Sequence, residues 1–205
     1  MEIKEKNIVN LLDKDDLKAL KDGDHEYLNS VGANCYNDGD YDIARIYYEL
    51  AAAMGNTTSL SNLGYIYMYG RDVPVDYSLA LAYFTMAANK GDIEATYKLG
   101  NLYQSGKGVE KNNNLALEYY DKALELIESD KDVIPKDYPS VYFTLAKEMM
   151  PGGSKETDLK KAYDYLNIAI DGYNYFIEME GANHYEKVRD EAYKLRDDNL
   201  FKDFK

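Results

Sequence analysis

Cysteine and histidine are scarce in this 205-residue chain, which has one cysteine, two histidines and no tryptophan. A single cysteine cannot form an internal disulfide, so a disulfide-stapled fold is excluded and a reducing, cytoplasmic location is expected. No cluster of cysteines and histidines with the spacing of a metal site can be assembled from these residues. We therefore expect neither a metal nor a cofactor.

Long apolar runs are also missing. The longest, residues 79–88, has about ten residues and includes Thr85, whereas a membrane-spanning helix needs about 20. The segment from Met1 to Lys6 lacks the apolar core of a signal peptide. These features predict a soluble protein without a membrane role.

Positive charge is in short supply. The chain has 24 Lys and Arg residues against 37 Asp and Glu residues, a formal net charge of −13. Such a field repels nucleic-acid phosphates and anionic lipid head groups, so we expect neither nucleic acid nor a membrane surface as partner. The excess charge can serve solubility alone, or it can steer a basic partner toward the chain, and the sequence leaves both open.

The most informative feature that is present is a repeat of 36 residues. Leu63-Gly64 recurs as Leu99-Gly100. Gly70, Ala80, Phe84 and Ala87 recur at the same offset as Gly106, Ala116, Tyr120 and Ala123. A fixed period of this length is typical of a stacked array of helix–turn–helix units.

Four units fit one pattern. Each has a small residue in a first helix, then Ala, a large apolar residue and Ala at offsets of four and seven on one face of a second helix. The units are Gly32 with Ala44, Tyr48 and Ala51; Gly64 with Ala80, Phe84 and Ala87; Gly100 with Ala116, Tyr120 and Ala123; and Ala146 with Ala162, Leu166 and Ala169. The small residue precedes the first Ala by 12 residues in the first unit (32 to 44) and by 16 in the others (64 to 80), so the first turn is shorter.

These units resemble Sel-one-like (Sel1-like) repeats, which are longer-looped relatives of the tetratricopeptide repeat. The clearest matches are Leu63-Gly64-Tyr65-Ile66-Tyr67 and Leu99-Gly100-Asn101-Leu102-Tyr103, each with the second helix that follows. The first unit has ordinary tetratricopeptide spacing, and the fourth departs from the pattern at Ala146 and Met149. The resemblance covers about residues 25–172. It implies an all-α, right-handed α/α superhelical solenoid whose relatives are mostly adaptors and scaffolds without catalytic activity.

The resemblance and the apolar pattern together divide the chain into six segments. These are an N-terminal capping helix at 1–23, repeat 1 at 24–56, repeat 2 at 57–92, repeat 3 with an extended loop at 93–136, repeat 4 at 137–180, and a C-terminal capping helix and tail at 181–205. The apolar spacing of Ile8, Leu11, Leu12, Leu17 and Leu20 predicts a helix over residues 3–20. We expect residues 199–205 to fray.

Candidate binding residues follow from the first helices, which line the concave side in tetratricopeptide-like stacks. The side chains expected to be exposed there are Asn29, Ala33 and Tyr36; Ser61, Tyr65 and Met68; Tyr97, Asn101 and Gln104; and Phe143 and Lys147. Aromatic faces and side-chain amides are what an extended peptide needs for its side chains and its unpaired main chain. The same aromatics could instead pack against neighbouring units, and both interpretations stay open.

Signals for catalysis are weak. His25 and His184 lie about 160 residues apart in the sequence, and Cys35 aligns with Tyr67 and Tyr103, which predicts a packing role. The acidic stretches 13–16 and 38–40 lack the distal Glu of a calcium loop, so we expect helix caps and turns there.

Three hypotheses about function follow. We favour a non-catalytic scaffold that binds a peptide or helix on its concave face. The alternative is a self-associating, homodimeric repeat protein, suggested by the aromatic run Tyr173–Ile177, although burial of that run within the last helix pair is the favoured interpretation. A hydrolase is the third, but no nucleophile beside a base supports it, so we predict that the chain is not an enzyme.

Overall fold

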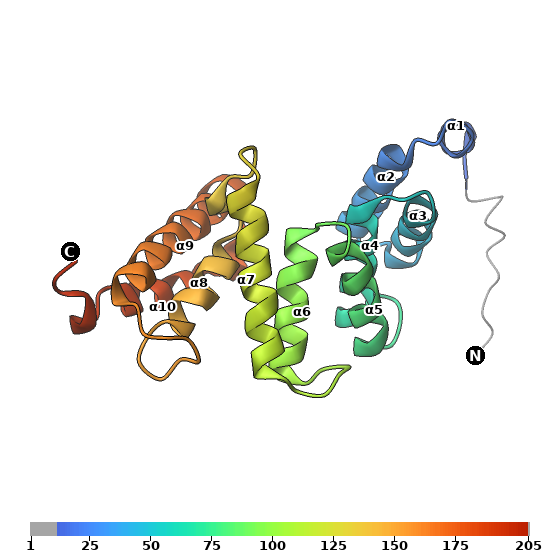
Figure 1. Cartoon of the computed structure of the whole chain (residues 1–205). Helices are drawn as coiled ribbons and strands as arrows, with labels where there is room; N and C mark the ends of the chain where they lie inside the picture. Colours follow the sequence, from blue (N-terminus) through green and yellow to red (C-terminus); the bar gives the residue numbers. More distant parts are fainter. Residues whose placement is uncertain (1–11, 205) are drawn as a thin grey trace. The chain divides into compact units, whose positions relative to one another are not determined.

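The computed structural model describes residues 12–204 and contains ten α-helices and no strand in that range (Figure 1). The helices are α1 (Lys14–Asp22), α2 (His25–Asp38), α3 (Tyr41–Ala53), α4 (Thr57–Tyr69), α5 (Tyr77–Ala88), α6 (Ile93–Ser105), α7 (Asn113–Ser129), α8 (Pro139–Glu148), α9 (Leu159–Glu180) and α10 (Glu186–Arg196). Short 3₁₀ turns occupy Pro135–Asp137, Asn183–Tyr185 and Asn199–Phe201. The predicted all-α class is confirmed, with α2/α3, α4/α5, α6/α7 and α8/α9 as the helix–turn–helix units of an α/α solenoid.

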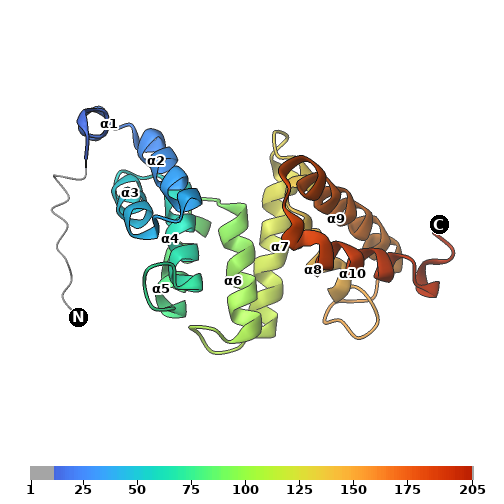
Figure 2. The same cartoon turned by 180° about the vertical axis from the view of Figure 1, so that it is seen from behind.

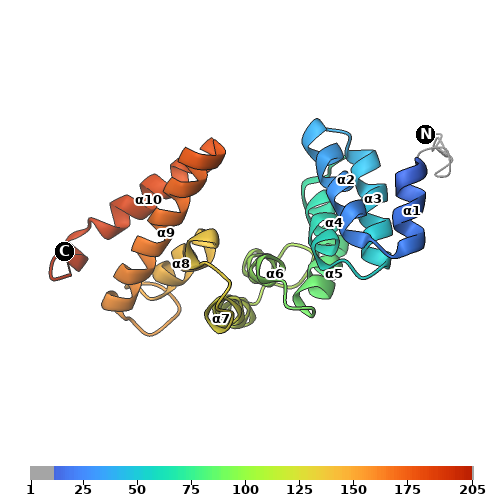
Figure 3. The ribbon, with the colours of Figure 1, turned by 90° about the horizontal axis from the view of Figure 1, so that it is seen from above.

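The helices divide between two compact units. The first holds the residues up to Ala95 together with Ser105–Lys111, and the second holds Thr96–Gln104 together with the residues from Asn112 onward. In the first unit α1 packs beside α2 and α3, as Figure 3 shows. In the second unit α10 packs along α9 (Figure 2).

Capping side chains explain why the helices begin where they do. At the start of the first helices, the side chains of Asp24, Asn56 and Asp92 each accept a bond from the backbone N–H three residues on. Asp76, Asn112 and Asp158 cap the second helices of repeats 2 to 4 in the same way. These short polar side chains satisfy N–H groups that have no partner within the helix, so the helix boundaries are encoded locally.

The turns inside the repeats close with one recurring backbone bond. The N–H groups of residues 40, 76, 112 and 158 donate to the carbonyls of Cys35, Tyr67, Tyr103 and Met149, respectively. The alignment of Cys35 with the two tyrosines is therefore confirmed in three dimensions. The thiol is half-buried beside the core formed by Ala44, Tyr48, Leu63 and Ile66.

The small residue of each repeat is matched to the side chain that faces it. A Cβ added to Gly64 would lie 2.6 Å from Phe84 Cε1, and one added to Gly100 would lie 2.3 Å from Tyr120 Cε1. Repeat 4 has Ala146 at this position and the smaller Leu166 in place of the ring, and both side chains are fully buried. The departure from the glycine pattern in repeat 4 is thus compensated within the same helix pair.

The N-terminal helix differs from its predicted extent. Part of the predicted helix, including Ile8 and Leu11, lies outside the described residues, and within them the helix begins at Lys14 because Asp13 caps it. Asp13 and Asp16 form a reciprocal capping box, and the buried Asp16 carboxylate also accepts a 2.6 Å bond from the Tyr47 hydroxyl of α3. Leu17, expected on the packed face, is 50% exposed.

The C-terminal residues are more ordered than expected. The tail forms a 3₁₀ turn at Asn199–Phe201, and Phe201 is 0% exposed with its ring 5.7 Å from that of Tyr163. The prediction that residues 199–205 fray is wrong for this turn, because burying an aromatic ring outweighs the entropy of a loose end. Between repeats 3 and 4, α7 extends to Ser129, and the extended loop predicted within residues 93–136 begins after it.

Candidate functional site

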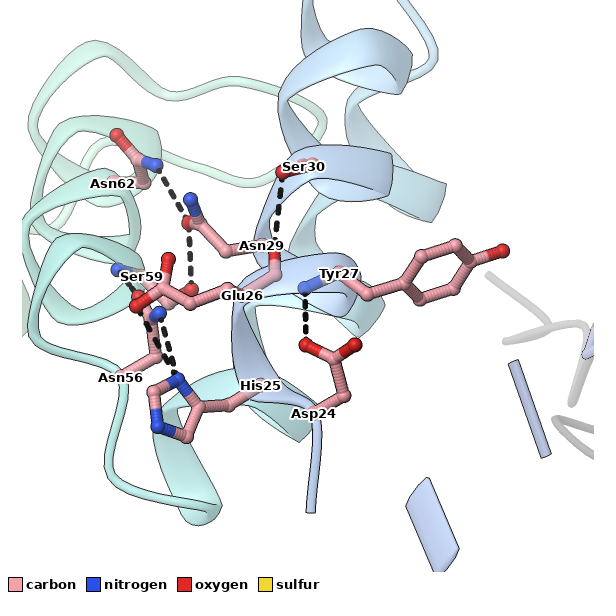
Figure 4. Close-up of polar contacts among 9 residues, drawn as sticks. All are labelled: Asp24, His25, Glu26, Tyr27, Asn29, Ser30, Asn56, Ser59 and Asn62. Atoms are coloured by element: carbon pink, nitrogen blue, oxygen red, sulfur yellow. Dashed lines mark hydrogen bonds and ion pairs between the residues drawn. The ribbon is translucent and has the colours of Figure 1, made fainter. Parts of the chain in front are cut away.

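The first helices of repeats 1 and 2 carry a cluster of polar side chains (Figure 4). The Oδ1 atom of Asn29 accepts bonds from the Ser59 hydroxyl at 2.8 Å and from the Asn62 side-chain amide at 3.4 Å. Because α2 contributes Asn29 and α4 contributes Ser59 and Asn62, these bonds align the two helices. Asn29 and Asn62 are both half-buried.

An amide group and an imidazole group support this cluster at the start of α4. The buried Asn56 caps α4 through Ser59, and its side-chain nitrogen lies 3.1 Å from His25 Nδ1 (Figure 4). When Asn56 donates, Nδ1 of His25 is the acceptor, which assigns the proton of a neutral imidazole to Nε2. His25 is therefore engaged in holding α2 against the start of α4.

Tyrosines continue the same face of α4 toward its C-terminal end. Tyr65 donates a 2.7 Å bond to Glu94, and its ring lies edge-on to the buried Phe84 and stacks with Tyr69 at 6.0 Å. Tyr69 is 54% exposed. We call the set of Asn29, Asn62, Tyr65 and Tyr69 the α2–α4 surface.

One predicted site residue of α4 is not where the sequence placed it. Ser61 is 5% exposed and lies against the Asp92 carboxyl group, so the expectation that it is exposed is wrong. Its neighbour Asn62 occupies the open stripe instead, in line with Tyr65 and Tyr69 at offsets of three and seven. The polar side chain of Asn62 was the signal that the sequence offered for an exposed position, but the helical spacing from Tyr65 fits Ser61 as well as Asn62. Met68 is half-buried.

In the second unit the predicted aromatics are packed inside. Tyr97 is 8% exposed and Phe143 is 7% exposed, so the expected exposure of both side chains is wrong. The Tyr97 hydroxyl lies 3.1 Å from the Thr144 hydroxyl, and the Phe143 ring lies edge-on to Tyr173. Both rings thus serve the packing that the sequence had left as the alternative.

The predicted amides of repeat 3 bind a tyrosine of their own repeat. The Tyr120 hydroxyl donates to Asn101 Oδ1 at 2.8 Å and approaches Gln104 Oε1 at 3.2 Å. Burial, with the nearby Tyr97 and Glu148, raises the pKa of Tyr120, so this phenol stays protonated as a donor. The side chains of Asn101 and Gln104 are therefore engaged within repeat 3.

The C-terminal helix covers part of repeat 4. Lys147 Nζ pairs with Glu191 of α10 at 2.9 Å and also lies 5.1 Å from the centre of the Phe143 ring. Asn174 of α9 donates to the Tyr193 hydroxyl of α10 at 2.9 Å. Of the sequence-predicted residues, Asn29 and Tyr65 therefore lie on the α2–α4 surface, whereas Phe143 and Lys147 of repeat 4 contact Tyr173 of α9 and Glu191 of α10, respectively.

A surface hollow lies at the start of α9. Its volume is about 620 Å³, and its lining includes Lys155, Lys160, Lys161 and Phe204. Lys155 pairs with Asp121 and Lys160 with Asp164, so two of its cations are already neutralised. The lining also includes Glu156 and Asp158, so charges of both signs surround the hollow and do not favour a ligand of one sign.

Reactive groups do not converge among the described residues. Within residues 12–204, no group of three or more His, Cys, Asp and Glu side chains is placed to hold a metal ion. Burial, together with the Asp40 and Asp38 carboxylates, raises the pKa of the Cys35 thiol, which disfavours the reactive thiolate. None of the helices within residues 12–204 has the length and hydrophobicity that a bilayer span requires.

Comparison with known proteins identifies the repeats. The family model of the Sel1 repeat matches residues 58–92, 93–126 and 142–174, and the model of a tetratricopeptide repeat matches residues 25–56. No curated protein matches the chain.

Two solved structures share the fold. The Sel1 repeat protein from Oxalobacter formigenes is 22% identical, with a TM-score of 0.61 over 80% of this chain and 63% of its own. A protective antigen of uropathogenic Escherichia coli with an SLR fold is 23% identical, with a TM-score of 0.59 over 78% of this chain and 34% of its own. The chain thus spans less than two thirds of the length of either protein.

Proteins built from Sel1 and tetratricopeptide-like repeats generally act as protein-interaction scaffolds, and the Sel1 family is typically non-catalytic. Three matched Sel1 units, one tetratricopeptide unit and the recurring turn bond all agree with this assignment. The chain belongs to the Sel1-like repeat proteins of the tetratricopeptide-like helical repeat superfamily.

Proposed function

We propose that this chain is a non-catalytic scaffold that binds an extended peptide segment of a partner protein on its α2–α4 surface. One observation carries the proposal. Asn29 Oδ1 is occupied by Ser59 and Asn62, but the Asn29 amide nitrogen and the Asn62 amide oxygen have no hydrogen-bond partner among the described residues (Figure 4). Neighbouring helices thus present one free donor and one free acceptor, which matches the C=O and N–H groups of an extended main chain.

The tyrosines of α4 add the apolar part of such a site. Tyr69 is more than half exposed, and Tyr65 is held in place by Glu94 and Phe84. Rigid aromatic rings next to main-chain ligands provide contact area with little loss of side-chain entropy. A peptide on this face would therefore gain affinity from Tyr65 and Tyr69 and orientation from Asn29 and Asn62.

The other predicted binding residues remain predictions. Tyr36 and Met68 lie in the same unit as the α2–α4 surface, whereas Asn101, Gln104 and Lys147 belong to the second unit, where each already has an internal partner. A basic partner and a cytoplasmic location are likewise proposed. The net charge of −13 and the single cysteine support them.

Self-association through the run Tyr173–Ile177 has less support. Tyr173 is buried, its ring packs against Tyr185, and Phe176 packs against the same Tyr185 ring. Much of the aromatic surface that suggested a dimer is thus used inside the second unit. Sedimentation at high concentration measures any self-association that remains.

Selection from a display library of linear peptides on the immobilised chain tests the proposal. We expect enriched peptides whose affinity falls about tenfold in Asn62→Ala, since one hydrogen bond to the peptide main chain is lost. Met86→Ser is a matched control, because Met86 is 52% exposed on α5 and takes no part in the α2–α4 surface. Circular dichroism confirms that both variants fold.

Two results would contradict the proposal. In one, no peptide is enriched on a folded chain. In the other, the enriched peptides bind Asn62→Ala as well as the unchanged chain but lose affinity in Met86→Ser, which would move the site to α5.

A further inference from the structure

A cation is already surrounded by tyrosines at the C-terminal end of the α2–α4 surface. The Arg71 guanidinium carbon lies 5.1 Å from the centre of the Tyr41 ring and 5.9 Å from that of Tyr69. The Tyr36 hydroxyl, followed by the Tyr41 and Tyr69 phenols, raises the pKa of Arg71, and the Tyr36 ring lies edge-on to that of Tyr41 with 5.0 Å between the ring centres. We call Tyr36, Tyr41 and Tyr69 the tyrosine cage, in which α2, α3 and α4 each contribute one ring.

The next repeat shows what this arrangement looks like without the cage. Lys107 occupies the position of Arg71 in the following turn, and it lies 5.1 Å from the ring of Tyr77, which corresponds to Tyr41. The positions that correspond to Tyr36 and Tyr69 there are Met68 and Ser105. A single cation–ring contact is thus shared by both turns, and the extra tyrosines belong to the first site alone.

The segment that supplies Arg71 is exposed and conformationally costly. Arg71 and Asp72 are both exposed, and Asp72 has φ +59°, the left-handed conformation that a side chain with a Cβ disfavours. The corresponding residue of the next turn is Gly108, also left-handed at φ +73°. Because Arg71 is exposed, its side chain can leave the tyrosine rings without disturbing buried packing.

Carboxylates give this corner of the first unit a negative potential. Asp38 is the last residue of α2 and Asp40 directly precedes α3, and both contribute to the raised pKa of the Cys35 thiol, next to Tyr36. Aromatic rings with carboxylates beside them bind a guanidinium through cation–π and charge attraction together. A neutral or acidic side chain would gain neither the cation–π attraction nor the charge attraction.

We propose that the tyrosine cage binds an arginine side chain of the partner segment, and that Arg71 occupies it as an internal competitor in the free chain. This inference rests on the proposed function, because the cage is continuous with the α2–α4 surface through the stacked rings of Tyr65 and Tyr69. The partner is therefore a basic, extended peptide segment. Its main chain lies along α2 and α4, and one arginine enters the cage.

The test uses two short, acetylated and amidated peptides of glycine and serine that differ only in a central arginine or norleucine. Their affinities for the full chain are measured by nuclear magnetic resonance titration of the tyrosine ring signals. In Arg71→Ser the competitor is gone, and we expect the arginine peptide to bind about three- to thirty-fold more tightly, the range of one cation–π contact. The norleucine peptide gains nothing.

Two further variants separate the cage from general effects of charge. Lys107→Ser removes a cation from the equivalent turn, where there is no cage, and leaves the affinity for the arginine peptide unchanged. Adding Tyr69→Leu to Arg71→Ser abolishes the gain, because one wall of the cage is lost. Circular dichroism confirms that each variant is folded.

The outcomes distinguish the cage from the site on which it depends. Equal binding of both peptides, weakened in Asn62→Ala but unaffected by Arg71→Ser, overturns the cage and leaves the proposed peptide site standing. An equal gain from Lys107→Ser also overturns the cage, since net charge alone would then explain it. If neither peptide binds any folded variant, both proposals fall.

Discussion

Replacing the glycine–aromatic pair of repeat 2 by the alanine–leucine pair of repeat 4 measures how strictly these residues are matched. Gly64→Ala places a methyl carbon 2.6 Å from Cε1 of Phe84, a fully buried ring. Overpacking a core costs about 1–3 kcal/mol, and so short a contact with an immobile ring belongs near the upper end. Because alanine favours the helix by about 1 kcal/mol over glycine, we expect a net loss of about 2 kcal/mol in unfolding free energy.

The double variant should recover most of this loss. Phe84→Leu alone is a modest change of apolar volume and costs about 1 kcal/mol. In Gly64→Ala with Phe84→Leu, the overlap disappears and the added methyl fills space that the ring vacated, as Ala146 does beside Leu166. We expect a double variant within about 1 kcal/mol of the unchanged chain, hence a coupling energy of about 2 kcal/mol.

Urea unfolding followed by far-ultraviolet circular dichroism measures these free energies, with tyrosine fluorescence as a second probe of two-state behaviour. The reciprocal exchange, Ala146→Gly with Leu166→Phe, is the matched control in the second unit, and there too the pair should be less destabilising than its single changes predict. If the double variant in repeat 2 lost about 3 kcal/mol, the sum of its single effects, the matching of glycine to the ring would be refuted.

Three further changes test other contacts. Burial raises the pKa of Asp92 above its ordinary 3.8. The contribution of Asp92 to the unfolding free energy is therefore present below pH 3.8 and is lost as the pH rises through the raised pKa. Asp92→Asn, which places the residue of Asn56 at this cap, should flatten this loss in urea titrations at pH 4 to 7. Tyr47→Phe removes the bond to buried Asp16 and should cost about 2 kcal/mol of unfolding free energy by the same assay, whereas no change would show that water replaces the hydroxyl. Phe201→Ala should cost about 3 kcal/mol and expose the C-terminus to limited proteolysis, and resistance equal to that of the unchanged chain would restore the prediction of a frayed tail.

The helical repeats could be predicted because their signals are local. A capping side chain such as Asn56 or Asp76 bonds to an N–H group two or three residues on, so the start of a helix depends on adjacent sequence. The spacing of Ala80, Phe84 and Ala87 identifies the packed face, and the structure buries all three. Cys35 could likewise be assigned a packing position from its place in the repeat alone.

The candidate site was predictable only in part. Helical spacing places the open face of α4 near Tyr65 but fits Ser61 and Asn62 almost equally, since neighbouring residues are separated by about 100° around the helix. Ser61 is buried near Asp92, whereas Asn62 is half-buried and donates to Asn29. The difference is decided by side chains about 30 residues away, which periodicity cannot register.

Residues a few positions apart set the caps, turns and helix faces, so the all-α array of Sel1-like repeats follows from the amino-acid pattern. Which aromatic and amide side chains stay open depends on contacts between distant parts of the chain. Tyr97 is buried in contact with Thr144, and Phe143 is buried in contact with Tyr173. Lys147 pairs with Glu191, 44 residues further along the chain. Whether a tyrosine packs inside or faces a partner depends on what the folded chain brings beside it, and a ring that suits a core suits an interface equally well.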